Sequence, residues 1–208
     1  MSDVRLKVCG VKSSAEATQL VSAGIDIVGL NFVEISSRFI SIETAEDIQN
    51  TLKGSGIQSV ALFAGRPLAD VNEYIRRLSI DYVQLHGNEP ADYARGVNAP
   101  VIRAIPVEPD NTPSQLLEFI DSFPAAYFVL DRHQQGQGSL VDIGLAKQII
   151  MAKPDKIFLA GGLSSENLQD VLSEIRPYGI DIASGVRDEQ DNLDISKVMQ
   201  CLKIIHNL

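Results

Sequence analysis

The chain has 208 residues, of which 45% are hydrophobic and 22% charged, and its formal net charge is −9. This length and composition predict one globular domain over residues 1–208, and the acidity excludes the basic surface of a nucleic-acid-binding protein. Two cysteines at opposite ends of the chain exclude a disulfide scaffold, and no apolar run approaches the ~20 residues that span a bilayer. Without a signal-peptide pattern at the N-terminus, we expect a cytoplasmic protein with no nucleic-acid or membrane partner.

Short apolar runs alternate with segments of helical period along the whole chain. The first run ends with Cys9 at a turn, and a helix that begins with a capping-box pattern follows the turn. The expected strands are residues 6–9, 26–32, 58–63, 81–85, 101–105, 127–130, 156–160 and 180–182. The expected helices are residues 13–22, about 43–52, 68–78, 89–95, one that includes 114–119, 142–151, 167–175 and 195–205. Cys201 falls in the apolar stripe of the last helix and is predicted to be a core residue.

Regular alternation of strands and helices demands a parallel sheet, and eight units are the number that closes it into a barrel. The predicted fold class is therefore α/β, a single-domain (β/α)8 TIM barrel. A doubly wound open sheet is the alternative, because periodicity alone does not distinguish an open sheet from a closed one. No Gly-x-Gly-x-x-Gly motif follows the first strand, which argues against a dinucleotide-binding open sheet.

Glycines gather after the last three expected strands. In barrels of this class the loops after strands seven and eight often bind phosphate through backbone N–H groups, which glycine lets approach the anion closely. Such a site suits an acidic protein, because it needs no basic side chain. The alternative is that the glycines only turn the chain after each strand. The candidate positions are Gly136, Gly138, Gly161, Gly162, Ser184 and Gly185.

Other chemistry-bearing side chains also follow strands. Cys9 and Asp131 end the first and sixth strands, where a thiol and a carboxyl group could act as a base and an acid. Equally, Cys9 could be a small core residue and Asp131 a cap or an ion-pair partner of Arg132. Arg38, after the second strand, could hold a substrate carboxylate in a bidentate pair or lie solvated in its loop. His86, after the fourth strand, is either a substrate ligand or a hydrogen-bonded structural histidine.

Six segments, in this order, resemble the phosphoribosylanthranilate isomerase family of tryptophan biosynthesis. They are Lys-Val-Cys-Gly at 7–10, Arg-Phe-Ile-Ser at 38–41, Val-Gln-Leu-His-Gly-Asn-Glu at 83–89, Leu-Asp at 130–131, Leu-Ala-Gly-Gly-Leu at 159–163 and Ser-Gly-Val at 184–186. The resemblance runs essentially from end to end, and the Gln-Leu-His-Gly and Ala-Gly-Gly-Leu segments are its most specific parts. The chain departs from the family pattern at Ser37, where proline is usual, and at Ala183, where serine is usual.

The resemblance implies an isomerase that converts N-(5-phosphoribosyl)anthranilate into 1-(2-carboxyphenylamino)-1-deoxyribulose 5-phosphate by an Amadori rearrangement. Asp131 matches the general acid that opens the sugar ring, and Cys9 matches the general base that removes the proton from C2. Arg38 matches the residue that engages the anthranilate carboxylate, and the glycine loops match the phosphate cradle, with His86 also placed among the substrate-binding residues. No metal and no organic cofactor is implied. We expect a phosphorylated sugar-anthranilate as substrate, and a monomer or homodimer.

Two other functions stay open at this point. A diverged relative could bind a phosphorylated sugar without turning it over, or the chain could be another phosphate-binding barrel enzyme. A Schiff-base aldolase would need an inward lysine at a strand end, for which Lys7 is the one strong candidate and a poor fit. A metal-dependent epimerase would need several converging histidines and acids. Lys7 could also promote ionisation of the Cys9 thiol, unless strand alternation points Lys7 away from the barrel interior.

Overall fold

The strands are hydrogen-bonded to one another in chain order and form a closed barrel. The computed structural model of the chain describes residues 4–132 and 140–207, and within them eight strands alternate with eight α-helices. Neighbouring strands pair in parallel, for example Cys9 with Gly29 and Leu62 with Gln84. The α/β class and the (β/α)8 TIM barrel are therefore confirmed, and the open doubly wound sheet is excluded. The domain bounds, residues 1–208, stay a prediction.

The element bounds lie close to the expected ones. The strands are β1 (Arg5–Cys9), β2 (Ile27–Asn31), β3 (Gln58–Phe63), β4 (Tyr82–Leu85), β5 (Val101–Val107), β6 (Tyr127–Arg132), β7 (Ile157–Leu159) and β8 (Gly179–Ile182). The helices are α1 (Ser14–Ala23), α2 (Ile42–Leu52), α3 (Leu68–Leu78), α4 (Ala91–Arg95), α5 (Pro113–Ser122), α6 (Ile143–Ala152), α7 (Leu168–Glu174) and α8 (Ile195–His206), with a 3₁₀ turn η1 (Ser184–Val186). None of the helices in the described ranges has the length and hydropathy of a membrane span.

One helix start differs from the expectation in a way that matters for the site. The sequence pattern predicts a helix from Glu89, but α4 begins at Ala91, after Pro90. The ring of a proline disfavours helical backbone in the residue before it, so Glu89 is kept outside the helix. Its carboxylate is buried instead against neighbouring loops.

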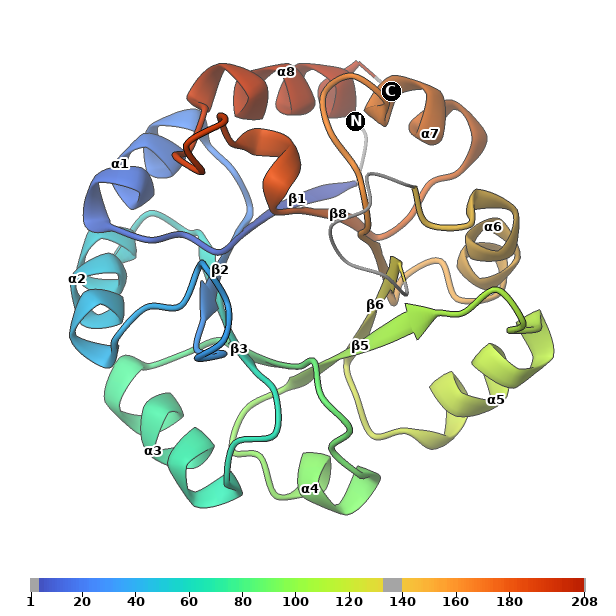
Figure 1. Cartoon of the computed structure of the whole chain (residues 1–208), viewed down its shortest axis with the longest axis horizontal. Coiled ribbons are helices and arrows are strands. Elements are labelled where there is room, and N and C mark those ends of the chain that lie inside the picture. Colours follow the sequence, from blue (N-terminus) through green and yellow to red (C-terminus); the bar gives the residue numbers. More distant parts are fainter. Residues whose placement is uncertain (1–3, 133–139, 208) are drawn as a thin grey trace. The chain divides into compact units, whose positions relative to one another are not determined.

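The chain divides into two compact units. The N-terminal unit comprises residues 7–103 with 124–126, and the C-terminal unit comprises the described residues among 1–6, 104–123 and 127–208. In the N-terminal unit α1 packs beside α2, and α2 beside α3 (Figure 1). In the C-terminal unit α5 packs beside α6, and α7 beside α8.

Strand register in the N-terminal unit decides which side chains share a face of the sheet. Cys9 pairs with Gly29, and Asn31, two residues farther along β2, pairs with Leu62, which in turn pairs with Gln84. Because side chains alternate along a strand and paired residues point the same way, these five residues share one face. We call it the inner face, because the helices pack on the other face.

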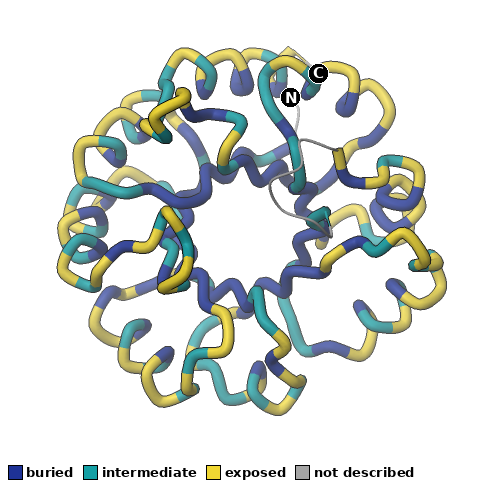
Figure 2. Tube along the Cα trace, viewed as in Figure 1, coloured by how far each residue is buried: buried dark blue, intermediate teal, exposed yellow. Residues whose placement is uncertain are grey.

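The opposite face of these strands packs against the helices. Phe63 of β3 stacks on Phe32, with ring centroids 5.2 Å apart, and meets Tyr74 of α3 edge-on at 5.6 Å. Figure 2 shows the strands buried almost throughout, whereas the helices alternate between buried and exposed residues. Lys7 is 0% exposed and, two residues before Cys9 in β1, lies on the inner face with it. Strand alternation therefore does not point Lys7 away from the thiol.

Candidate active site

Cys9 ends β1 on the inner face, in a position with room for its thiol. A Cβ on Gly29 of the neighbouring strand would lie 3.0 Å from Cys9 Sγ, so the missing side chain there makes space for the sulfur. Cys9 is 8% exposed, so its thiol is largely buried without being sealed off. Directly after it, Gly10 turns the chain with a φ of +77°, a conformation that glycine adopts without strain. The thiol thus lies at the carboxyl end of its strand, where barrel enzymes carry their chemistry.

Arg38 lies beside this turn. A Cβ on Gly10 would be 2.4 Å from Arg38 Cδ and 3.1 Å from Arg38 Cβ, so the aliphatic stem of the arginine packs on the glycine. The loop that carries Arg38 is held by Ser36, whose hydroxyl oxygen accepts from Arg38 N at 3.2 Å and from Asn31 Nδ2 at 3.0 Å. The structure therefore brings the predicted carboxylate ligand next to the residue that follows the predicted base.

His86 directly follows β4 and is half-buried. Its N–H donates to the carbonyl of Phe63 at 2.9 Å, which continues the pairing of β3 with β4 by one residue. Alternation from Gln84 places His86 on the inner face, the face of Cys9. Cys9 and His86 therefore lie at carboxyl ends of strands within the N-terminal unit, and Arg38, in the loop after β2, lies beside the turn at Gly10.

In the C-terminal unit, Asp131 lies near the end of β6 and is half-buried. Its Oδ1 accepts from Arg132 N at 2.8 Å. A Cβ on Gly161, after β7, would lie 3.0 Å from the same Oδ1 and 2.8 Å from Arg132 N. Gly161 has a φ of +88°, so only a glycine lets the loop after β7 pass this close to the carboxylate without strain. Asp131 and Gly161, predicted separately, are neighbours.

The loops after β7 and β8 also touch. A Cβ on Gly185 would lie 2.0 Å from the carbonyl oxygen of Leu163, so the two backbones are in direct contact at that point. Asn167 fixes the first loop, because its amide donates to Gly162 O at 2.8 Å and its Oδ1 accepts from Ser164 N at 3.0 Å. The two loops therefore bring four of the predicted residues together within the C-terminal unit: Gly161, Gly162, Ser184 and Gly185. Gly136 and Gly138 lie outside the described residues.

A further acid in the C-terminal unit was missed by the sequence reading. Asp181 of β8 is buried, and its strand neighbour Gly179 pairs with Phe158, which pairs with Val129 of β6. Alternation puts Asp181 and Asp131 on the same face of their strands. The available signal was a lone acid between two isoleucines at 180–182, a pattern that an ordinary buried strand does not need.

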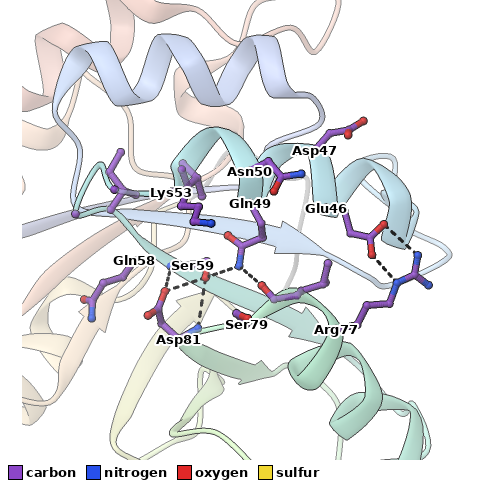
Figure 3. Close-up of a pocket in the computed structure, with 15 residues that line it drawn as sticks. Glu46, Asp47, Gln49, Asn50, Lys53, Gln58, Ser59, Arg77, Ser79 and Asp81 are labelled. Carbon is purple, nitrogen blue, oxygen red and sulfur yellow. Dashed lines mark hydrogen bonds and ion pairs between the residues drawn. The ribbon is translucent and has the colours of Figure 1, made fainter.

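A separate cavity of about 720 Å³ opens at the amino ends of β3 and β4, the opposite ends from the predicted site (Figure 3). Its polar groups bind one another. Ser59 donates its hydroxyl to Asp81 Oδ2 at 2.9 Å, and Gln49 Nε2 donates to Ser59 Oγ at 3.0 Å and to Leu78 O at 2.8 Å. None of the predicted site residues lines this cavity, and we read its hydrogen bonds as structural.

Cys201 is a core residue of α8, as predicted. It is 0% exposed, and burial raises the pKa of its thiol from 9.0 to about 11, so it stays protonated at neutral pH. Among residues 4–132 and 140–207, no three His, Cys, Asp or Glu side chains are grouped as metal ligands.

The family model and the curated relatives give the same family. Residues 6–203 match the family model described as N-(5'phosphoribosyl)anthranilate (PRA) isomerase. The N-(5'-phosphoribosyl)anthranilate isomerase of Oceanobacillus iheyensis is 34% identical over 200 residues, which cover 94% of this chain and 93% of the relative. The crystal structure of phosphoribosyl anthranilate isomerase from Thermus thermophilus has a TM-score of 0.86 at 29% identity and covers 98% of this chain and 99% of its own. A phosphoribosyl anthranilate isomerase in complex with reduced 1-(o-carboxyphenylamino)-1-deoxyribulose 5-phosphate has a TM-score of 0.83 at 27% identity, over 99% of this chain and 100% of its own.

Proposed function

Because this chain belongs to the N-(5'-phosphoribosyl)anthranilate isomerase family, we propose that Cys9 and Asp131 are the base and the acid of its reaction. The chain is an isomerase of tryptophan biosynthesis that converts N-(5'-phosphoribosyl)anthranilate into 1-(2-carboxyphenylamino)-1-deoxyribulose 5-phosphate. The family match over residues 6–203 carries the reaction. The proposed roles of Cys9, Asp131 and His86 rest on their positions at or near the carboxyl ends of strands, and that of Arg38 rests on its contact with Gly10.

Asp131 gives a proton to the ring oxygen of the sugar. The C1–O bond then breaks, the nitrogen lone pair forms a C=N bond, and the open-chain iminium results. The acid must begin protonated, and its Oδ1, which accepts from Arg132 N, is suited to be the carbonyl oxygen of a neutral carboxyl. The close approach of Gly161 keeps one side of the carboxyl covered by backbone.

Cys9 then removes the proton from C2. The C2–H electron pair forms a C1=C2 bond, and the iminium nitrogen recovers its lone pair, which gives an enolamine. Loss of the proton on the C2 hydroxyl and protonation of C1 yield the ketone. The iminium is an electron sink, so a base of modest strength suffices. The reacting form is the thiolate, which a cation near it favours, and Lys7 lies on the same face of β1 as Cys9.

Arg38 binds the anthranilate carboxylate through its guanidinium, a geometry in which two parallel N–H groups meet two oxygens. Its stem is held against Gly10, which follows the base in the chain. Recognition of the carboxylate and orientation of C2 toward the thiol thus depend on the same stretch of backbone. His86 contributes a further polar contact to the substrate from the end of β4.

The phosphate is bound by backbone N–H groups of the Gly161, Gly162, Ser184 and Gly185 group. The contact between Gly185 and the Leu163 carbonyl supports this proposal, because it fixes the two loops relative to each other. Oriented N–H groups hold an anion without a basic side chain, which fits the net charge of −9.

The test is rescue of a tryptophan auxotroph that lacks this isomerase, with turnover by the purified protein as the second measurement. We expect the wild-type chain to rescue growth, and Cys9→Ala and Asp131→Asn each to lower kcat by about 10²–10⁴, the usual worth of one general acid or base. Failure of the wild type in both assays would contradict the activity. Rescue and turnover by both variants at wild-type rates would contradict the assigned roles alone.

A further inference from the structure

A buried carboxylate that the reaction does not use joins three strands of the N-terminal unit. Glu89 Oε1 accepts from Gly65 N at 2.6 Å, and its Oε2 accepts from Gly87 N at 3.0 Å and from Arg103 NH1 at 3.0 Å. The side chains of Glu89 and Arg103 are 3% and 10% exposed. Gly65 follows β3, Gly87 follows β4, and Arg103 belongs to β5. One side chain therefore ties together the loops after β3 and β4 and the neighbouring strand.

The local sequence is fitted to this carboxylate. Pro90 keeps Glu89 out of α4, which leaves its side chain to turn back toward the sheet. A Cβ on Gly87 would lie 2.6 Å from Glu89 Oε1 and 3.0 Å from Gly65 N, so a side chain at position 87 would collide with the ion pair. All three contacts to the carboxylate come from donors, so an ionised carboxylate satisfies them and a neutral amide in its place does not.

The ion pair lies behind the sheet and does not reach the inner face. Arg103 pairs in register with Leu85. Leu85 lies between Gln84 and His86 in the chain, so its side chain points to the opposite face from theirs. Arg103 is therefore on the helix face, whereas His86 is on the inner face with Cys9. His86 N–H donates to Phe63 O at 2.9 Å, and the N–H of the following residue, Gly87, donates to Glu89 Oε2. The backbone of His86 is therefore held on both sides.

We propose that Glu89, paired with Arg103, is a positioning residue that fixes the loop carrying His86 in its substrate-binding conformation. This rests on the proposed role of His86 in substrate binding. Glu89 does not touch the substrate. Its buried charge is retained because a carboxylate is the one group that accepts hydrogen bonds from two loop amides and a guanidinium together.

The test combines kinetics with a spectroscopic readout, using Glu89→Gln in the full chain. We expect Glu89→Gln to raise KM for N-(5'-phosphoribosyl)anthranilate by about tenfold and to change kcat by less than about threefold, because the residues that move protons are untouched. In a His86→Ala background, Glu89→Gln should raise KM no further, because the side chain that it positions is gone. An equal rise of KM in both backgrounds, or no rise in either, would overturn the proposal.

The second readout needs no turnover, so failure of the proposed function is distinguishable from failure of this inference. The chain has three histidines, and loss of one imidazole signal in His86→Ala assigns the NMR resonance of His86. Glu89→Gln should broaden or shift that resonance and leave the other two unchanged. An unchanged His86 resonance would overturn the inference even in a fully active enzyme.

Two controls complete the design. Glu46→Gln removes a more exposed ion pair of the same unit, in which Arg77 Nε lies 2.6 Å from Glu46 Oε1 (Figure 3), and should alter neither KM nor the His86 signal. If Glu89→Gln does not fold, the double variant Glu89→Gln/Arg103→Met removes the buried cation together with the carboxylate and takes its place in both measurements, with the same outcomes expected.

Discussion

The aliphatic stem of Arg38 packs directly against Gly10, and a Cβ on that glycine would lie 2.4 Å from Arg38 Cδ. Gly10 also follows Cys9 and has a φ of +77°. The position thus needs glycine twice, once for its backbone conformation and once for the space that the arginine fills. The two requirements can be separated by experiment, because Gly24 has a φ of +73° with nothing within 4 Å of its Cβ position.

We expect Gly10→Ala to impair substrate binding and Gly24→Ala to leave it unchanged. Both variants place a side chain in left-handed backbone and should lose about 1 kcal/mol of unfolding free energy. In Gly10→Ala the Arg38 stem must also move, so KM should rise by about tenfold, equivalent to about 1.4 kcal/mol of lost binding. Denaturant unfolding and steady-state kinetics on both proteins are the measurements. Equal KM values in the two variants would contradict the assignment of Arg38 to the substrate carboxylate.

Cys9 is expected to act as a base and not as a nucleophile. The largely buried thiol at the end of β1 should therefore take a proton without forming a bond to the substrate. Intact-protein mass spectrometry during turnover, after an acid quench, should show no adduct on the wild-type chain. Cys9→Ser, whose hydroxyl is a far weaker base near neutral pH, should lower kcat by about 10²–10⁴. A mass increase equal to the substrate, absent from Cys9→Ser, would contradict the base assignment.

The barrel could be predicted from the sequence because its signal is local and repeated. Each strand is a short apolar run and each helix an apolar stripe, so eight units emerge without knowledge of any long-range contact. The same reading places Cys9, His86 and Asp131 at or near the ends of strands and Arg38 in the loop after a strand, and the structure has them there.

The contacts made between distant positions could not be predicted in the same way. The sequence pattern predicts Glu89 as the first residue of a helix, whereas it binds Gly65 and Arg103, 24 and 14 positions away in the chain. Its effect depends on tertiary packing that periodicity does not encode. The pattern around Asp181 does not single it out, because its two isoleucine neighbours alone satisfy a strand. Polar residues inside an otherwise apolar strand are the signal that such a reading should weigh more heavily.

Gly185→Ala tests the proposed phosphate-binding loops of the C-terminal unit. The new Cβ would lie 2.0 Å from the Leu163 carbonyl oxygen, so the loops after β7 and β8 must separate. We expect KM for the substrate to rise by at least about tenfold, and inhibition by inorganic phosphate to weaken in parallel, because both ligands use the same N–H groups.

Gly144→Ala is the matched control for Gly185→Ala. Gly144 lies in α6, where a Cβ would meet Asp142 Oδ1 at 3.4 Å, an ordinary contact, and alanine favours the helix. In this variant, KM for the substrate and the inhibition constant of inorganic phosphate should both stay at their wild-type values. A Gly185→Ala protein that is folded and equally sensitive to phosphate would place the phosphate elsewhere.

Cys201 should make the stability of the protein fall at high pH. Burial raises the pKa of its thiol in the folded state from 9.0 to about 11, so between these values the unfolded chain releases a proton that the folded chain retains. The contribution of the neutral thiol is therefore complete below about pH 9 and is lost as the pH rises toward about 11, by on the order of 2 kcal/mol.

Cys201→Ala removes this dependence and adds only a constant cost for the missing sulfur. Denaturant unfolding of both proteins at about pH 8 and about pH 10.5 measures the difference, to which Cys9, the lysines and the tyrosines contribute equally in the two chains. The wild type should lose about 2 kcal/mol more than Cys201→Ala over that interval. Equal losses in the two proteins would mean that the Cys201 thiol ionises as readily in the folded chain as in the unfolded one.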